Sequence, residues 1–332
     1  MQMKMYYFRW VIDSKMREKI WWIFIICATI LFLFLCLSGT SSAVTWYVAE
    51  NGSANFTRIQ DAINISSAGD TIIITNGSYT ENVNVNVSYL TLRSGNGSHS
   101  TFIRAKSRSD HVFEVTADYV NISGFTIMNA TNPDNAGIYL GSDVDHCTIT
   151  DSNVSKNYIG ISLDASCRNT IINNTFSYNG YGFYLYRSSS NNTITNNTVF
   201  SNEYDGINLR FSCCNTITNN TVTNNSATNY YAGIHLHSSD DNLIYNNYFN
   251  NTNNARDDDG DNTWNIIKTF GTNIIGGPYL GGNYWADYTG EDWNRDGLGD
   301  TRPYYSPNAV YSSDGIDDGA DYLPLVPCTS PP

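Results

Sequence analysis

The sequence predicts an all-β protein, a parallel β-helix in which short strands wind into a stack of coils. Two sequence motifs that alternate along the chain support this prediction. One is Asn-Thr-Ile-x-Asn-Asn-Thr, which begins at Asn169, Asn192 and Asn215 and returns in a looser copy at Asn242. The other is Gly-(Ile/Phe)-x-Leu, which begins at Gly137, Gly160, Gly182, Gly206 and Gly233. Both recur roughly every 22 to 27 residues, a period typical of stacked repeats.

Each repeat has the pattern of strands joined by tight turns. Apolar and polar residues alternate within a copy, as from Ile207 to Arg210, and Asn, Gly and Ser separate the alternating runs. A period of two predicts strands, and no copy holds an apolar pattern of helical length. A leucine-rich repeat is excluded because the recurring positions are Ile, Gly, Asn and Thr. One coil cannot bury its own apolar face, so the coils must stack.

Stacking in register predicts interior columns, with about 4.8 Å between successive coils. One column is predicted to hold Ile171, Ile194, Ile217 and Ile244. Another is predicted to hold Leu163, Leu185, Leu209 and Leu236.

The paired asparagines suit the corners of such coils. Asn tolerates the left-handed conformation of a sharp corner, and stacked Asn side chains can hydrogen-bond from coil to coil. Asn-Asn-Thr also matches the N-glycosylation sequon, of which the chain holds roughly fifteen copies. We favour the corner role within the repeats. Outside them the two interpretations are equally supported, at Asn51, Asn55, Asn64, Asn76, Asn86 and Asn96.

Residues 1–43 are predicted to be a secretion signal. The basic residues Lys15, Arg17 and Lys19 precede an apolar run from residue 20 to 37, and small residues end at Ala43. The alternative is an uncleaved membrane anchor, because the run is nearly long enough to span a bilayer. Either way the repeats are expected outside the cell or on its surface.

Charge argues against nucleic-acid binding. The chain holds 18 Lys and Arg against 31 Asp and Glu, a net charge of −13, with only 15% charged residues. Phosphate contacts require clustered Lys and Arg. We expect no nucleic-acid partner, and membrane contact only through the N-terminal segment if it is not cleaved.

Residues 44–105 are predicted to form the N-terminal cap and the first coils. Residues 45–48 and 71–74 have strand patterns, as do 83–87 and 89–92. Between the first two, residues 55–68 place apolar side chains on one helical face, with Asn55 as the expected N-cap. This amphipathic helix would cover the open end of the stack.

A family resemblance follows from these motifs. The runs 56–63, 69–72 and 77–82 are similar to the opening of pectin-lyase-like right-handed β-helices. With the Asn-Asn-Thr coils, residues 44–327 most resemble the NosD-like branch, the carbohydrate-binding and sugar-hydrolase repeats of archaeal and bacterial surface proteins. The resemblance implies a right-handed solenoid, export, and contact with polysaccharide or cell-envelope glycan. Some relatives are periplasmic accessory proteins in copper-site maturation, and others are lyases, hydrolases, esterases or epimerases.

Repeats are predicted over residues 106–268, followed by an irregular aromatic and acidic C-terminal cap over 269–332. The cap holds a candidate calcium loop of the dockerin kind, since Pro303 stands where an EF-hand has Glu; a solvated acidic turn is the alternative. Its expected ligands are Asp292, Asn294, Asp296, the Leu298 carbonyl and Asp300. A weaker acidic cluster, residues 257–261, is expected to be a loop between coils. The tail aromatics are expected to plug the last coil, or else to stack on sugars: Trp264, Tyr284, Trp285, Tyr288 and Trp293.

The outward positions of the Gly-Ile-x-Leu strands hold the candidate functional residues. Alternation predicts two outward columns: Tyr139, Ser162, Tyr184, Asn208 and His235 in one, and Gly141, Asp164, Tyr186, Arg210 and His237 in the other. Aromatic rings stack on sugars, and charged groups bind uronates. The predicted ligand-binding set is therefore Tyr139, Asp164, Tyr184, Tyr186, Asn208, Arg210, His235 and His237. An ordinary exposed strand face, with no ligand, is the alternative.

Three functions stay open. The leading one is a non-catalytic surface protein that binds glycans or forms part of the envelope. The second is a polysaccharide lyase, hydrolase or epimerase, with catalytic candidates Asp164, Tyr184, Arg210 and His237. The third is a copper-handling accessory protein in which His235 and His237 are two metal ligands, although a third is missing. The cysteine spacing predicts no disulfide framework.

Overall fold

A computed structural model describes residues 42–226, 228, 230–258, 261–305 and 320–327. The described residues from Ala43 onward belong to one compact unit, which is described below. The predicted secretion signal lies almost wholly outside the described residues. Within those residues, no helix is long and apolar enough to cross a membrane.

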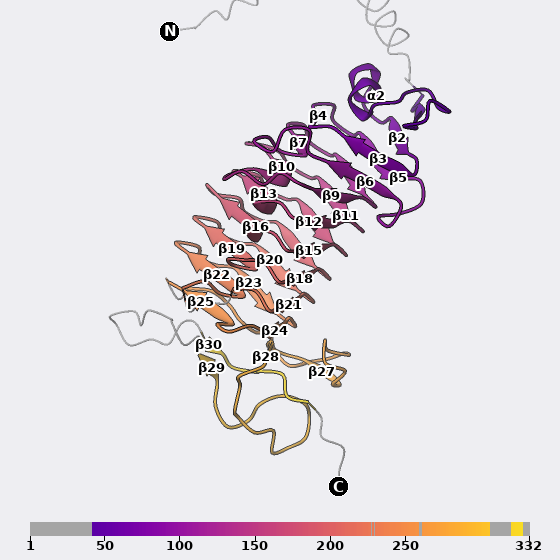
Figure 1. Ribbon diagram of the computed structural model, residues 1–332. Coiled ribbons are helices and arrows are strands. Elements are labelled where there is room, and N and C mark those ends of the chain that lie inside the picture. The colour runs from indigo at the N-terminus through magenta and orange to yellow at the C-terminus, as the bar shows by residue number, and fades with distance from the viewer. Residues whose placement is uncertain (1–41, 227, 229, 259–260, 306–319, 328–332) are drawn as a thin grey trace, which may run out of the picture. The chain divides into compact units, whose positions relative to one another are not determined.

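The described residues wind into a parallel β-helix with one short helix, as predicted (Figure 1). Three parallel sheets form its walls, and each coil passes through sheet A, then B, then C. Sheet A consists of β1 (Thr45–Val48), β2 (Thr71–Ile74), β5 (Thr91–Ser94), β8 (Asn121–Ser123), β11 (Thr148–Thr150), β14 (Thr170–Ile172), β17 (Thr193–Thr195), β20 (Thr216–Thr218) and β23 (Leu243–Tyr245).

Sheet B consists of β3 (Gly77–Thr80), β6 (Thr101–Arg104), β9 (Thr126–Met128), β12 (Asn153–Ser155), β15 (Thr175–Ser177), β18 (Thr198–Phe200), β21 (Thr221–Thr223), β24 (Tyr248–Asn250) and β28 (Tyr284–Trp285). Sheet C consists of β4 (Val83–Val85), β7 (Phe113–Val115), β10 (Ala136–Leu140), β13 (Ile159–Asp164), β16 (Tyr181–Tyr186), β19 (Ile207–Arg210), β22 (Ile234–His237) and β25 (Ala255–Asp257). Two antiparallel pairs lie outside these sheets, β26 (Thr269–Phe270) with β27 (Tyr279–Leu280) and β29 (Tyr304–Tyr305) with β30 (Ala320–Asp321).

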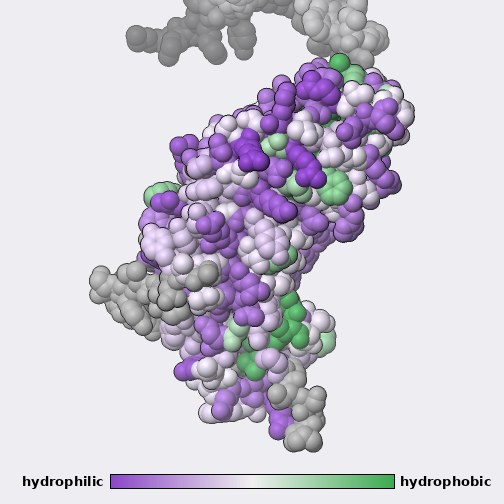
Figure 2. Space-filling model, viewed as in Figure 1, coloured by the Kyte–Doolittle hydropathy of each residue, from purple (hydrophilic) through white to green (hydrophobic). Residues whose placement is uncertain are grey.

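Successive coils superimpose residue for residue, which confirms both interior columns. Ile194 pairs with Ile171 and Ile217, and Leu209 pairs with Leu185 and Leu236. All of these side chains have no exposed surface. Burying one such side chain stabilises the fold by about 1.5–3 kcal/mol. The face seen in Figure 2 is correspondingly mostly hydrophilic over the coils.

Buried asparagines link the coils at their corners. At the corner between sheets A and B, Asn197 is 1% exposed, and its side-chain oxygen accepts hydrogen bonds from the backbone and side-chain nitrogens of Asn174. Its Nδ2 donates to the carbonyls of Ile171 and Thr195 and to Oδ1 of Asn220, at 2.9, 3.0 and 3.1 Å. Two further ladders of this kind begin at Asn157 and Asn169 and continue through successive coils. Coil-to-coil hydrogen bonding by Asn, predicted from the sequence, is confirmed.

The first position of the Gly-Ile-x-Leu motif requires glycine for a steric reason. A Cβ atom on Gly182 would overlap the carbonyl oxygen of Gly206 in the next coil. Any side chain at this position would push the coils apart, so the motif begins with Gly.

The N-terminal helix is shorter than predicted and is capped differently. Helix α2 (Ile59–Ile65) begins after Arg58, and Asn55 is not its N-cap. Instead, the carboxylate of Glu81 accepts hydrogen bonds from the backbone nitrogens of Ile59 and Gln60 at 2.9 and 3.2 Å. A residue from the following coil thus satisfies the free N–H groups of the helix. The Asn55 side chain accepts from the Tyr47 nitrogen.

Aromatic rings close the far end of the stack. Trp285 stacks on Phe249 with 4.6 Å between ring centroids, and Tyr304 stacks on Trp285 at 4.2 Å. Trp264 and Trp285 are each 2% exposed, as expected for a plug. Trp293 does not belong to it, because its side chain is 72% exposed.

Replacement of Asn197 by Ala is expected to destabilise the coils far more than replacement of its neighbour. The substitution leaves the buried backbone N–H of Asn174 without its acceptor and removes one donor each from the carbonyls of Ile171 and Thr195, at a cost of about 3 kcal/mol. The matched control is Asn196→Gly, because the exposed Asn196 has φ of 55° and glycine adopts that conformation freely. Urea unfolding followed by circular dichroism measures both. Equal stability of the two variants would contradict a structural role for the ladder.

Candidate functional site

The outward columns of sheet C have the predicted register. Tyr184 pairs with Asn208, and Asn208 pairs with His235. Arg210 pairs with Tyr186 on one side and His237 on the other. The parallel ladder therefore places side chains more than 20 residues apart in sequence on one rigid surface.

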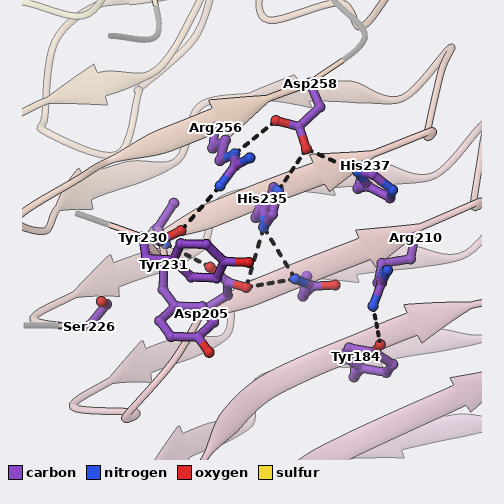
Figure 3. A network of polar contacts seen from close by, with 12 residues as sticks. Tyr184, Asp205, Arg210, Ser226, Tyr230, Tyr231, His235, His237, Arg256 and Asp258 are labelled. Carbon is purple, nitrogen blue, oxygen red and sulfur yellow. Dashed lines mark hydrogen bonds and ion pairs between the residues drawn. The ribbon is translucent and has the colours of Figure 1, made fainter. Parts of the chain in front are cut away.

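A cleft of about 250 Å³ opens on the later coils of this sheet, at β16, β19, β22 and β25. Five of its residues belong to the predicted ligand-binding set: Tyr184, Asn208, Arg210, His235 and His237. Six were not foreseen: Tyr181, Asp205, Tyr230, Tyr231, Arg256 and Asp258. Most of these side chains form one polar network (Figure 3).

His235 lies between two carboxylates. Its Nδ1 is 3.5 Å from Oδ2 of Asp205, and its Nε2 is 3.2 Å from Oδ2 of Asp258. Burial disfavours the charged imidazolium, but hydrogen bonds and charge from the two carboxylates outweigh burial and raise the pKa of His235. Both ring nitrogens thus face acceptors.

Asp258 connects three basic side chains. Besides His235, its carboxylate contacts Nδ1 of His237 at 3.0 Å and Nε of Arg256 at 2.8 Å. Burial opposes its ionisation, but the hydrogen bonds from His237, Arg256 and His235 lower the pKa of Asp258 to about 2. The carboxylate is therefore ionised at neutral pH and holds the three basic side chains around the cleft.

Asp205 anchors the floor of the cleft. It is 1% exposed and accepts hydrogen bonds from the Ala232 backbone nitrogen and from Nδ2 of Asn208, both at 2.6 Å. Asn208 is itself 4% exposed, and its Oδ1 has no hydrogen-bond partner among the described residues. A buried oxygen without a donor is energetically costly.

Arg210 and the tyrosines form the exposed side of the cleft. Arg210 is exposed and donates to the Tyr184 hydroxyl at 3.3 Å, and this hydrogen bond raises its pKa. Tyr181 lies between Tyr184 and Tyr204, with centroid distances of 5.2 and 4.9 Å, and Tyr231 lies 4.9 Å from Tyr204. The site thus combines a cation, aromatic rings and hydrogen-bonding groups.

The remaining predicted residues form a separate cluster earlier on the same sheet. Asp164, expected to face outward, is 3% exposed because Tyr139 and Arg187 cover it. The Tyr139 hydroxyl donates to Asp164 at 2.9 Å, and Arg187 pairs with the same oxygen at 3.2 Å. Of the four catalytic candidates, the structure brings Tyr184, Arg210 and His237 to one cleft and leaves Asp164 outside it.

Four of the six unforeseen cleft residues lie outside the strands of sheet C: Asp205, Tyr230, Tyr231 and Asp258. Asn215 and Asn242 are 27 residues apart, whereas Asn192 and Asn215 are 23 apart. The longer coil contains Tyr230 and Tyr231. The unequal spacing of the asparagines was therefore the sequence signal for an insertion beside sheet C. Asp258 belongs to the acidic segment expected to be only a loop between coils.

Comparison with known proteins adds the family. The family described as "Periplasmic copper-binding protein (NosD)" matches residues 63–290. The chain belongs to the NosD family. A "Cell surface glycoprotein" of Methanothermus fervidus is 37% identical over 132 residues, which are 39% of this chain. The aligned part is only 21% of that relative's length.

Solved structures with the same fold include enzymes and a viral protein. An alginate lyase from Paenibacillus sp. str. FPU-7 aligns with 62% of this chain and 76% of its own, at 18% identity and a TM-score of 0.50. The ORF18 protein of Geobacillus virus E2 aligns with 60% of this chain and 45% of its own, at 19% identity and a TM-score of 0.51. At such identity the likeness concerns the fold alone.

In the described part of this NosD-family chain, both predicted copper ligands, His235 and His237, contact a carboxylate. No group of three or more His, Cys, Asp or Glu suited to a metal ion occurs in the ranges that the structure covers. His235 and His237 meet at Asp258, whose other oxygen is bound by Arg256. Copper binding stays a prediction from the sequence, and no step of the proposed function uses it.

In the predicted calcium loop, backbone N–H groups of the loop donate hydrogen bonds to its own carboxylates. The Asp292 carboxylate accepts from the nitrogens of Asp296 and Gly297, at 3.1 and 2.7 Å. Asp300 accepts from the nitrogens of Trp293 and Asn294, at 2.8 and 3.1 Å. Asp296 accepts from the Leu298 nitrogen and pairs with Lys268. Calcium binding at this loop stays a prediction.

Asp258→Asn is expected to lower the pKa of His235, because it removes a carboxylate that favours the imidazolium while the ring stays buried. NMR titration of the imidazole measures this shift, and Asp164→Asn, outside the cleft, is the control that leaves it unchanged.

The folded pKa of His235 lies above its ordinary value of about 6.5, so its charge stabilises the fold below that pH and ceases to do so as pH rises through the folded value. The stability difference between the wild type and His235→Gln should therefore shrink with rising pH; a growing difference would contradict the assignment.

Proposed function

We propose that this NosD-family protein is an exported, cell-surface β-helix that binds an acidic glycan in the sheet C cleft without cleaving it. The observation that carries the proposal is the exposed Arg210, held beside Tyr184 at the opening of a cleft lined with tyrosines. The predicted export signal and the surface-glycoprotein relative support the location.

The arrangement of charges favours an anionic ligand. The two carboxylates of the cleft are each engaged by groups of the protein, Asp205 by Asn208 and Ala232, and Asp258 by Arg256 and two imidazoles. Arg210 has one hydrogen bond among the described residues, so most of its five N–H donors are available for a ligand carboxylate. Uronic acids present such a carboxylate next to a ring that packs on tyrosine.

The surroundings of His235 favour binding over catalysis. A general base needs a free ring nitrogen within hydrogen-bonding distance of the substrate proton. Both nitrogens of His235 face carboxylates, so this imidazole holds the site together instead of accepting a proton.

A second candidate function, uronate lyase activity, has one observation in its favour. His237 contacts Asp258 through Nδ1 and is 39% exposed, as a base oriented by a carboxylate would be. In such a reaction Arg210 would neutralise the uronate carboxylate and His237 would remove the neighbouring C–H proton. We favour binding because the other imidazole of the cleft, His235, has both ring nitrogens next to carboxylates.

Arg210→Ala is expected to weaken binding of polygalacturonate or alginate at least about tenfold, since a hydrogen bond to a charged group contributes about 1.5–3 kcal/mol. Isothermal titration calorimetry at low and moderate salt measures the affinity. Arg187→Ala is the matched control, an exposed arginine directly after β16 of the same sheet that pairs with Asp164 outside the cleft. Equal losses in both variants would indicate non-specific attraction and overturn the site.

The same mixtures separate binding from lysis. Unsaturated uronate products absorb in the ultraviolet, so a lyase would produce rising absorbance that His237→Gln abolishes. Binding with constant absorbance supports the proposed function. Rising absorbance would establish the second candidate instead.

A further inference from the structure

The two asparagines of each Asn-Asn-Thr corner have opposite surroundings. In Asn196-Asn197-Thr198 the second one, Asn197, is 1% exposed and its amide is fully engaged in the ladder. The first, Asn196, is exposed, lies at φ of 55°, and has no side-chain hydrogen bond among the described residues. One coil earlier, Asn173 is likewise exposed at φ of 58°, beside the buried Asn174.

The N-glycosylation sequon selects the exposed member of each pair. The acceptor sequence is Asn-x-Ser/Thr, so Asn196 qualifies through Thr198. Asn197 does not qualify, because the second residue after it is the core residue Val199. The strand alternation that buries Val199 also turns Thr198 outward, where it is exposed. The repeat therefore separates a structural asparagine from a potential acceptor by a single residue.

We propose that the corner between sheets A and B is a glycosylation site, with Asn196 and Asn173 as acceptors. The donor is an oligosaccharide activated as a lipid-linked phosphate or diphosphate. The side-chain Nδ2 forms a bond to the anomeric carbon, the bond from that carbon to the phosphate oxygen breaks, and Nδ2 loses one proton. The lipid phosphate leaves with the electron pair, and no oxidant or reductant takes part.

Two other sequons of the coils lack one of these features. Asn219 is only half exposed, and its side-chain oxygen accepts a hydrogen bond from Asn246. Asn224 is exposed, but Ser226, the third residue of its sequon, is 5% exposed, and its hydroxyl donates to the Thr228 carbonyl. These two positions are therefore expected to carry less glycan than Asn196, and they provide internal comparisons.

The glycosylation site and the cleft lie on different parts of the coil. Asn173 and Asn196 follow sheet A strands β14 and β17 directly, whereas every strand that lines the cleft belongs to sheet C. Glycans at the A–B corner would cover that corner and leave the cleft open. The inference therefore does not depend on the proposed function.

Peptide mass spectrometry of the full protein, purified from the cells that naturally produce it, tests the proposal. Occupied Asn173 or Asn196 peptides support it. Unmodified Asn at both positions, or glycan found only at Asn219 and Asn224, would overturn it.

Paired variants produced in the same cells identify the acceptor. Asn196→Gly and Thr198→Ala should each remove one glycan mass and leave the melting temperature nearly unchanged. Asn197→Gln should retain the glycan, because the middle position of the acceptor sequence tolerates glutamine, while its melting temperature falls. If Asn197→Gln does not accumulate, Thr198→Ser, which keeps the sequon and the fold, takes its place. Loss of glycan in the sequon-retaining variants, or its retention in Thr198→Ala, would contradict the assignment.

Discussion

The stacking of coils depends on amide hydrogen bonds that are removed from water. At each corner the polypeptide passes from one sheet to the next, and its carbonyls would otherwise be buried without donors. The side chain of each ladder asparagine donates hydrogen bonds to these carbonyls. Asn220, with no exposed surface, accepts from the coil before it and donates to two carbonyls. Because the penalty for an unpaired buried group is large, the ladder holds the register of neighbouring coils residue for residue.

A fixed register converts sequence spacing into surface geometry. Side chains such as Tyr184, Asn208 and His235 lie next to one another only because their backbones pair in parallel. The core columns make this surface rigid, since each Ile or Leu contacts its counterparts above and below. A binding face on such a wall needs little ordering on ligand binding, which lowers the entropic cost of association.

Electrostatics within the cleft are arranged by two carboxylates. Asp205 and Asp258 hold His235 between them, and Asp258 also orients His237 and Arg256. An ionised carboxylate with a pKa of about 2 keeps these groups in place over the whole physiological range. The cation left facing solvent, Arg210, is then the group best placed to meet an anionic ligand.

The sequence alone determined the fold, because a period-two pattern repeated about every 23 residues has one way to bury its apolar face. It also determined which residues share the outward columns, since alternation and register are local rules. Only the tertiary structure decided that Asp164 is covered by Tyr139 and that Glu81 caps the helix, because both contacts join different coils. It likewise decided that Asp258 enters the cleft, since the irregular segment that carries it follows no repeat.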